Sequence, residues 1–280
     1  RNLIVCIDGT GNESGPNSTN VWKLHEKIDL KSTNPEQLAV HFRGIGTRPK
    51  SLRCSDRIKR AVYDTVDKAV ALSVKKTVQD AYRWLAKRFQ EGDQIYLFGF
   101  SRGAYQVRVL AGMIHEVRPG LITNYGLVLN TAYSYYKAIR STEPKTRQSA
   151  SDFKNTHCWK DLRVHFVGVW DTVSSVGLIR GDVFLSTSSS AAHACHFRHA
   201  LALDELRVKF MPEYFHEMNS QSDDGKSKYV VTSHDVERAS SVSDTLIDHG
   251  TDLSGCDHKQ PDIKEVWFAG SHSDVWVAPP

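Results

Sequence analysis

The stretch IYLFGFSRGAYQVRVLAGMI, residues 95–114, decides how the chain folds. It begins as a continuous apolar run of strand length, and from Gly103 to about His115 its apolar residues have the spacing of a helix. Between the two parts stands Gly-Phe-Ser-Arg-Gly. A strand that passes directly into a helix at such a sequence is typical of a nucleophile elbow, here with Ser101 as the nucleophile.

An elbow turn needs small residues around its serine. Glycines are required two residues before and two residues after it, because side chains there would collide where the strand and the helix cross. Gly99 and Gly103 occupy these positions, and Ala104 keeps the crossing narrow. The Gly-x-Ser-x-Gly pattern also arises by chance, so a serine in a tight structural turn is the alternative. The strand and the helix on either side favour the elbow.

Outward from this stretch, segments with strand character alternate with segments of helical spacing. Strands are predicted at 2–8, 37–46, 94–100, 162–171, 228–233 and 263–272, and helices at 18–28, 57–89, 103–115, 125–141 and 194–210. The segment 57–89 is either one long helix or two consecutive helices. The first helix has Ser18 or Thr19 as its N-cap. This alternation predicts an α/β fold that is α/β-hydrolase-like, with a mostly parallel central sheet flanked by helices on both faces.

The length of 280 residues suffices for one large α/β domain or two small ones. The sequence contains no internal repeat and no linker, which predicts a single catalytic domain over 1–280. Two stretches, 141–155 and 240–262, are polar and aperiodic and indicate loops, and the insertions near 116–160 and 235–262 that contain them could form a lid over the domain.

Charge, hydropathy and cysteine content restrict the class of protein. The net charge of +4 is mild and Lys and Arg form no block, so we expect no nucleic-acid partner. The apolar runs are far shorter than the roughly 20 residues of a membrane span. No signal peptide is visible, although the chain opens at Arg1 without a methionine, so we expect a cytoplasmic protein without a transmembrane segment. The five scattered cysteines predict no disulfide framework and a reducing compartment.

An attacking serine needs a base and a carboxylate that orients the base. Asp171 fits the carboxylate, because the apolar run VHFVGVW delivers it at the end of a strand, and Thr172 and Ser174 stand close by. An aspartate that caps the next turn is the alternative. For the base, His234 and His272 each follow a predicted strand, and both stay open on the residues alone.

Position in the chain prefers His272, because in α/β-hydrolases the histidine comes last and here it follows the final strand. Gly270 lets its loop turn. Asp274, two residues further on, either holds this loop or forms an ordinary turn.

The oxyanion of the reaction needs preorganised donors. One is the backbone N–H of Arg102, which follows the nucleophile. The second is expected from Gly9 or Thr10, in the glycine-containing loop DGTGN after the first strand.

Two other kinds of chemistry fit the sequence less well. The run CIDGTGN resembles the Asp-x-Asp-x-Thr motif of haloacid-dehalogenase-type phosphatases, but Cys6 stands where the nucleophilic aspartate should be. The run HACHFRHA, residues 193–200, concentrates histidine and cysteine, and on a helix Cys195 or His196 would share a face with His199. Further ligands with a defined spacing are missing, so we predict no metal site.

Five motifs in order carry a family resemblance: IVCIDGTGN, FGFSRGAY, VGVWDTVSSVG, HALALDE and VWFAGSHSD. They closely resemble the catalytic domain shared by bacterial type VI secretion phospholipase effectors and their fungal relatives, and the residues of the motifs are most similar to those of the fungal branch. The resemblance spans residue 2 to about 275. It implies a triad formed by the serine of GFSRGA, the aspartate of WDTV and the histidine of the last loop. In this chain these are Ser101, Asp171 and His272, so the resemblance favours His272 over His234.

We therefore expect a serine-dependent carboxylic ester hydrolase that acts on lipids or phospholipids through an acyl-enzyme, without a metal or organic cofactor. A peripheral membrane contact through apolar residues of the insertions would suit such a substrate. A catalytically inactive relative that binds a lipid or protein partner in the same cleft is the alternative. Its motivation is the end of the chain, which reads HSDVWVAPP where the family continues with glycines and further helices. We expect the C-terminal end to be truncated.

Overall fold

The fold was analysed in a computed structural model of the chain. The structure describes residues 1–9, 19–44, 56–117, 133–134, 136, 148, 162–173, 194–205 and 262–275. Its elements, in chain order, are β1 (Asn2–Ile7), α1 (Asn20–Glu26), β2 (Gln37–Phe42), α2 (Asp56–Arg88), β3 (Gln94–Phe100), α3 (Arg102–Val117), β4 (Val164–Trp170), β5 (Ala194–Ala202) and β6 (Asp262–Phe268).

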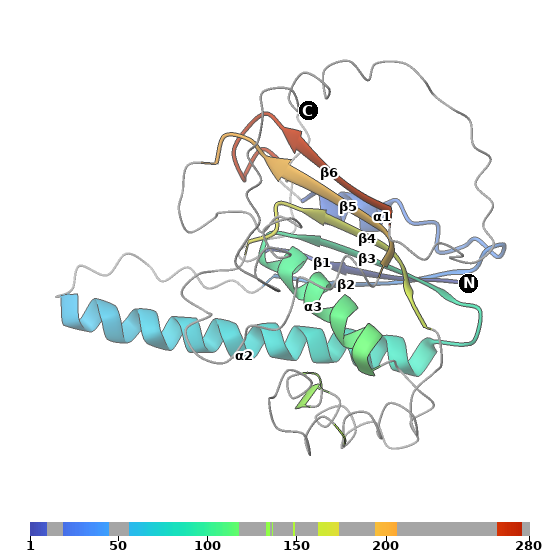
Figure 1. The fold of residues 1–280 in the computed structure, drawn as a ribbon, viewed down its shortest axis with the longest axis horizontal. Coiled ribbons are helices and arrows are strands. Elements are labelled where there is room, and N and C mark those ends of the chain that lie inside the picture. Colours follow the sequence, from blue (N-terminus) through green and yellow to red (C-terminus); the bar gives the residue numbers. More distant parts are fainter. Residues whose placement is uncertain are drawn as a thin grey trace.

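The strands form one six-stranded sheet in the order β2-β1-β3-β4-β5-β6, and every pair is parallel. Figure 1 shows the strands side by side with their arrowheads at the same end. Helices cover both faces, since α2 and α3 pack on one face and α1 on the other. The α/β-hydrolase-like fold predicted from the sequence is therefore confirmed.

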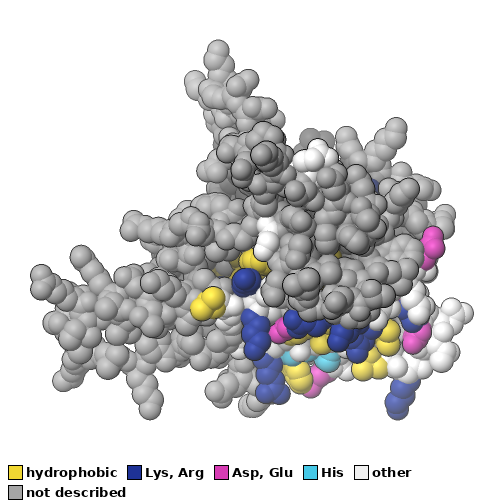
Figure 2. Space-filling view, turned by 90° about the horizontal axis from the view of Figure 1, so that it is seen from below, with side chains coloured by type: hydrophobic (Ala, Val, Ile, Leu, Met, Phe, Trp, Pro, Cys, Tyr) yellow, Lys and Arg dark blue, Asp and Glu magenta, His cyan; other side chains and the backbone are white. Residues whose placement is uncertain are grey.

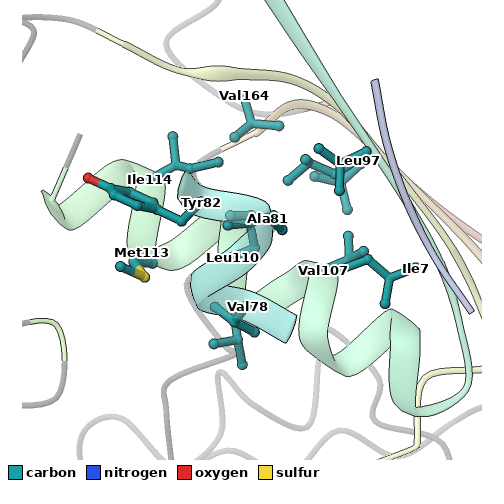
Figure 3. Close-up of a cluster of buried hydrophobic side chains, with 14 of the residues drawn as sticks. Ile7, Val78, Ala81, Tyr82, Leu97, Val107, Leu110, Met113, Ile114 and Val164 are labelled. Carbon is teal, nitrogen blue, oxygen red and sulfur yellow. The ribbon is translucent and has the colours of Figure 1, made fainter. Parts of the chain in front are cut away.

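The larger core lies between the sheet and the pair α2 and α3. Figure 3 shows buried side chains of both helices together with side chains of strands β1, β3 and β4, and ten residues of this cluster are labelled. They are Ile7, Val78, Ala81, Tyr82, Leu97, Val107, Leu110, Met113, Ile114 and Val164. A smaller cluster under α1 joins Val21 to Ile4, Cys6 and Phe100 on the opposite face. The sheet is thus buried on both sides where the elbow forms, which explains why its strands read as continuous apolar runs.

Most element predictions near the elbow are confirmed. The segment 57–89 is one helix of 33 residues, α2, and Thr19 caps α1 by accepting a hydrogen bond from the Trp22 N–H at 2.9 Å.

The helix predicted at 194–210 is wrong, because residues 194–202 form strand β5. Its side chains alternate between buried and half-buried positions, so Phe197 and His199 lie on one face and His196 and Arg198 on the other. The Ala- and Leu-rich spacing suits a helix as well as a strand, and pairing with β4 and β6 decides between them.

One cysteine also departs from the prediction. Cys195 on β5 is disulfide-bonded, whereas Cys6 is a buried free cysteine. Cysteine spacing along the chain does not reveal which thiols the fold brings together, so the sequence could not predict this bond.

Several predicted segments lie wholly or mostly outside the described residues. They are the insertions near 116–160 and 235–262, the helix 125–141, the strand 228–233, and the residues Thr10, Ser174 and His234. Within the described part, no helix combines the length and apolar character that a membrane span requires. Figure 2 shows Lys and Arg on one face, with acidic and hydrophobic side chains among them.

Replacement of Leu110 by alanine tests the core between α2, α3 and the sheet. Leu110 is 0% exposed, and we expect Leu110→Ala to lower the free energy of unfolding by about 2–5 kcal/mol, because it opens a cavity in a close-packed interior. Urea unfolding followed by circular dichroism measures this. Leu72→Ala is the matched control, since Leu72 is 69% exposed on α2 and a change of no more than about 0.5 kcal/mol is expected there. Equal losses in both variants would contradict the packing described.

Candidate active site

The predicted site residues lie at one edge of the sheet. Because all six strands are parallel, their carboxyl ends face the same side. Ser101 follows β3, Asp171 follows β4, and His272 lies in the loop after β6. Asp8 and Gly9 follow β1 at the same edge.

Ser101 has a left-handed backbone conformation, as the predicted elbow requires. Its φ angle is 56°, in the left-handed region that costs a non-glycine residue about 1–2 kcal/mol. A Cβ placed on Gly99 would lie 2.6 Å from the Gly103 carbonyl oxygen, and one placed on Gly103 would lie 2.2 Å from that of Ile7. Both glycines are therefore needed, because the start of α3 crosses β3 and the end of β1 with backbone almost touching backbone.

The structure brings Ser101, His272 and Asp171 together in one hydrogen-bonded series. His272 Nε2 lies 2.8 Å from Ser101 Oγ, and His272 Nδ1 is hydrogen-bonded to Asp171 Oδ2. All three residues are buried, with 5%, 6% and 0% of their surface exposed. The ring of Phe100 stacks on the His272 imidazole with centroids 4.8 Å apart, which fixes the plane of the ring.

Asp171 is held in a second strained turn. Its φ angle is 41°. Its N–H donates to the Ala200 carbonyl at 2.7 Å, and its Oδ1 accepts the Ala202 N–H at 3.1 Å. Strand β5 thus orients the carboxylate so that the second oxygen faces His272.

His272 must reach past a whole strand to meet Asp171, because β5 separates β6 from β4. Residues just after β5 hold its loop. The Gly270 N–H donates to Asp204 Oδ2 at 2.7 Å, the Asp204 N–H donates back to the Gly270 carbonyl at 3.0 Å, and the His272 N–H donates to Glu205 Oε2 at 3.1 Å. The sequence prediction gave Asp204 and Glu205 no role, although both belong to the HALALDE motif.

The same loop is closed from its other side by Asp274. Its Oδ2 accepts the N–H and the hydroxyl of Ser271 at 2.7 and 2.8 Å, and these bonds, the backbone one first, keep the pKa of Asp274 below its usual value. Asn20 at the start of α1 donates to the Val275 carbonyl at 3.0 Å. The φ angle of 110° at Gly270 allows the turn.

The predicted oxyanion donors flank Ser101. Arg102 begins α3 directly after it. A Cβ placed on Gly9 would lie 3.1 Å from the Ser101 Cβ, so the Gly9 backbone stands beside Ser101. The other candidate, Thr10, lies outside the described residues.

Asp8 anchors the start of the Gly9 loop. The Asp8 N–H donates to the Phe42 carbonyl at 3.0 Å, and its carboxylate accepts the Thr19 hydroxyl and lies 2.8 Å from His41 Nε2. The buried carboxylate therefore joins β1, β2 and the first turn of α1. In the sequence, the only indication of this role was the position of Asp8 at the end of a predicted strand, directly before a glycine-containing loop.

The competing sites receive no support from the described residues. Burial raises the pKa of the Cys6 thiol to about 12, so at neutral pH it stays protonated and unreactive. His196 and His199 do not share a face on β5, and within the described part of the chain no group of three or more His, Cys, Asp or Glu side chains is arranged to hold a metal ion.

Several known proteins are similar to this chain. A family model described as "T6SS, Phospholipase effector Tle1-like, catalytic domain" matches residues 1–277. The chain is 35% identical over 222 residues to "Uncharacterized protein YEL023C" of Saccharomyces cerevisiae. It is also similar to the solved structure of the Tle1 effector bound to the VgrG spike of the type 6 secretion system, with 14% identity and a TM-score of 0.41. An uncharacterized protein from Pseudomonas aeruginosa gives 16% identity and a TM-score of 0.43.

These relatives are longer than the chain. The yeast match covers 75% of the chain but 32% of the yeast protein. The two structural matches cover 76% and 98% of the chain, and 47% and 41% of the respective solved chains.

Replacement of Gly103 by alanine tests the crossing at the elbow. The added methyl would clash with the carbonyl oxygens of Ile7 and Asp8, at 2.2 and 2.6 Å, and neither can rotate away. We expect Gly103→Ala to lower the free energy of unfolding by about 3 kcal/mol or more, measured by urea unfolding. Gly92→Asn is the control, because Gly92 has open space around it and asparagine tolerates its φ of 89°. An unchanged urea midpoint for Gly103→Ala would rule out the tight crossing.

Proposed function

Because this family model matches residues 1–277, the chain belongs to the family of Tle1-like phospholipase effector catalytic domains, and from this premise we propose that it is a serine-dependent carboxylic ester hydrolase acting on lipids or phospholipids. The observation that carries the proposal is the hydrogen-bonded series from Ser101 Oγ through the His272 imidazole to the Asp171 carboxylate. A serine hydroxyl is a poor nucleophile unless a base of this kind removes its proton.

The proposed reaction begins when Ser101 Oγ attacks the ester carbonyl carbon while His272 Nε2 takes the hydroxyl proton. Asp171 keeps the proton of His272 on Nδ1 and stabilises the imidazolium that forms. His272 then gives its proton to the leaving alcohol, which departs and leaves the acyl group on Ser101. Water, activated by the same imidazole, attacks the acyl-enzyme, so the fatty acid leaves and Ser101 regains its proton. Side chains and water carry every step.

The carbonyl oxygen becomes negatively charged during each attack. We assign its stabilisation to the backbone N–H of Arg102 and to that of Gly9 or Thr10, because Gly9 stands beside Ser101. A helix N-terminus adds a favourable partial charge, and Arg102 is the first residue of α3.

The substrate class rests on the family, whose description names a phospholipase. We propose that residues 1–280 act as one catalytic domain. Apolar insertion residues would supply a peripheral membrane contact for a lipid substrate.

Hydrolysis of short p-nitrophenyl esters tests the proposal. Ser101→Ala removes the nucleophile, and we expect it to lower kcat by about 1000-fold or more. Ser73→Ala on helix α2 should keep the wild-type rate. Equal rates for the wild type and Ser101→Ala would refute the proposed serine-hydrolase activity. They would favour the alternative, an inactive relative that binds a lipid or protein partner.

Phospholipid vesicles extend the same comparison to the substrate. We expect the wild type, and not Ser101→Ala, to release fatty acid and lysophospholipid, detected by mass spectrometry. Hydrolysis of p-nitrophenyl esters without any lipid product would contradict the lipid substrate while leaving the serine mechanism intact.

A further inference from the structure

The turn that presents Asp171 depends on a residue outside the predicted triad. The N–H of Thr172, the next residue, donates to His199 Nε2 at 3.2 Å. This bond lies directly after the strained φ angle of Asp171. It adds to the two bonds from Asp171 to β5, so a side chain of β5 as well as its backbone holds the turn.

His199 is in turn held by Glu265. The two residues are direct neighbours in the β5–β6 register, and His199 Nδ1 lies 2.9 Å from Glu265 Oε1. A backbone N–H can only donate, so Nε2 of His199 must accept and carries no proton. The single proton of the neutral ring is therefore on Nδ1, where it is donated to Glu265.

The surroundings of His199 keep this neutral form. Burial, with 2% of the residue exposed, is the largest cause that lowers its pKa. The hydrogen bond to Glu265 raises the pKa, the nearby charge of Arg108 on α3 lowers it, and the charges of Glu265 and Asp171 raise it. Together these effects hold the pKa of His199 below its ordinary value, so at neutral pH Nε2 is free of a proton and can accept the Thr172 N–H.

We propose that His199 and Glu265 are positioning residues for the reaction: Glu265 fixes the tautomer of His199, and His199 fixes the Thr172 amide so that the Asp171 carboxylate stays aimed at His272. This inference rests on the proposed serine-hydrolase function. It gives His199, in the histidine-rich run 193–200, a role other than metal binding.

Two substitutions of His199 separate positioning from mere packing. Glutamine places its carbonyl oxygen near the site of Nε2, so it retains an acceptor for the Thr172 N–H. Asparagine is shorter and reaches only the site of Nδ1, so the Thr172 N–H loses its acceptor. With p-nitrophenyl esters we expect His199→Asn to lower kcat by about 10- to 100-fold with KM nearly unchanged. His199→Gln should stay within about threefold of the wild type. Equal kcat values for the two variants would overturn the proposal.

Proton NMR gives a readout that does not depend on turnover. The Nδ1 proton shared by His272 and Asp171 should give a far-downfield signal, assigned by its loss in His272→Gln. We expect it in the wild type and in His199→Gln, and shifted or lost in His199→Asn. An unchanged signal in His199→Asn would contradict the positioning role. If the wild type shows the signal but hydrolyses no ester, the proposed function fails and the positioning result still stands.

Glu265 offers a second pair if the His199 variants do not fold. Its side chain is 15% exposed on the edge strand β6, so substitution disturbs less packing. Glu265→Gln keeps a carbonyl acceptor for the Nδ1 proton, and Glu265→Leu removes it. We expect the loss of kcat and of the downfield signal only in Glu265→Leu. The same kcat in both variants would overturn the proposal.

The pH dependence of stability tests the protonation state of His199. Its pKa in the folded protein lies below the ordinary value of 6.5, so below pH 6.5 the unfolded chain binds a proton that the folded chain does not. Stability from this residue is therefore present above pH 6.5 and is lost as the pH falls. Between pH 7.5 and 5.5, the urea midpoint should decrease more for the wild type than for His199→Gln. Equal decreases would mean that folded His199 takes up the proton, which contradicts the required tautomer.

Discussion

The parallel direction of the six strands is the constraint on which the rest of the structure depends. It places the carboxyl ends of β1, β3, β4, β5 and β6 at one edge, and each of these ends contributes to the site. Since β3 and β4 are neighbours, Ser101 and Asp171 stand at adjacent strand ends, and the His272 imidazole links their side chains. His272 comes from β6, beyond β5, so its loop has to pass over the end of β5. The hydrogen bonds of Asp204 and Glu205 to that loop bridge the gap.

Two consecutive strand ends of the sheet store backbone strain. Ser101 and Asp171 both have positive φ angles, each costing about 1–2 kcal/mol. Hydrogen bonds between the ends offset this cost: the Ser101 N–H donates to the Trp170 carbonyl at 2.9 Å, and the Asp171 N–H donates to that of Ala200 at 2.7 Å. A buried hydrogen bond contributes about 0.5–1.5 kcal/mol. We therefore expect both turns to be stable only in the assembled sheet.

Prediction from the sequence succeeded where a local pattern was unambiguous. The apolar run before Ser101 and the glycines around it lie within ten residues, so the strand and the turn could be predicted locally. For the cap of α1, the sequence left Ser18 and Thr19 both open. It failed at residues 194–202, where the spacing suits a helix and a strand equally. There the pairing with β4 and β6, separated from β5 in sequence, selected the strand. The same long-range pairing gives His199 its neighbour Glu265, 66 residues away, and no local pattern could have joined them.

The sequence alone indicated the elbow motif around Ser101, the strand-end candidate Asp171 and the alternation of strands and helices, because each lies in the spacing of neighbouring residues. It left His234 and His272 both open as the base, and the family resemblance favoured His272. Only the tertiary structure decided that His272 reaches Ser101, that Asp8 anchors the Gly9 loop, and that the HALALDE motif holds the histidine loop. These depend on which strands become neighbours and in what register. Burial between those strands then gives each hydrogen bond a low-dielectric surrounding in which its geometry is retained.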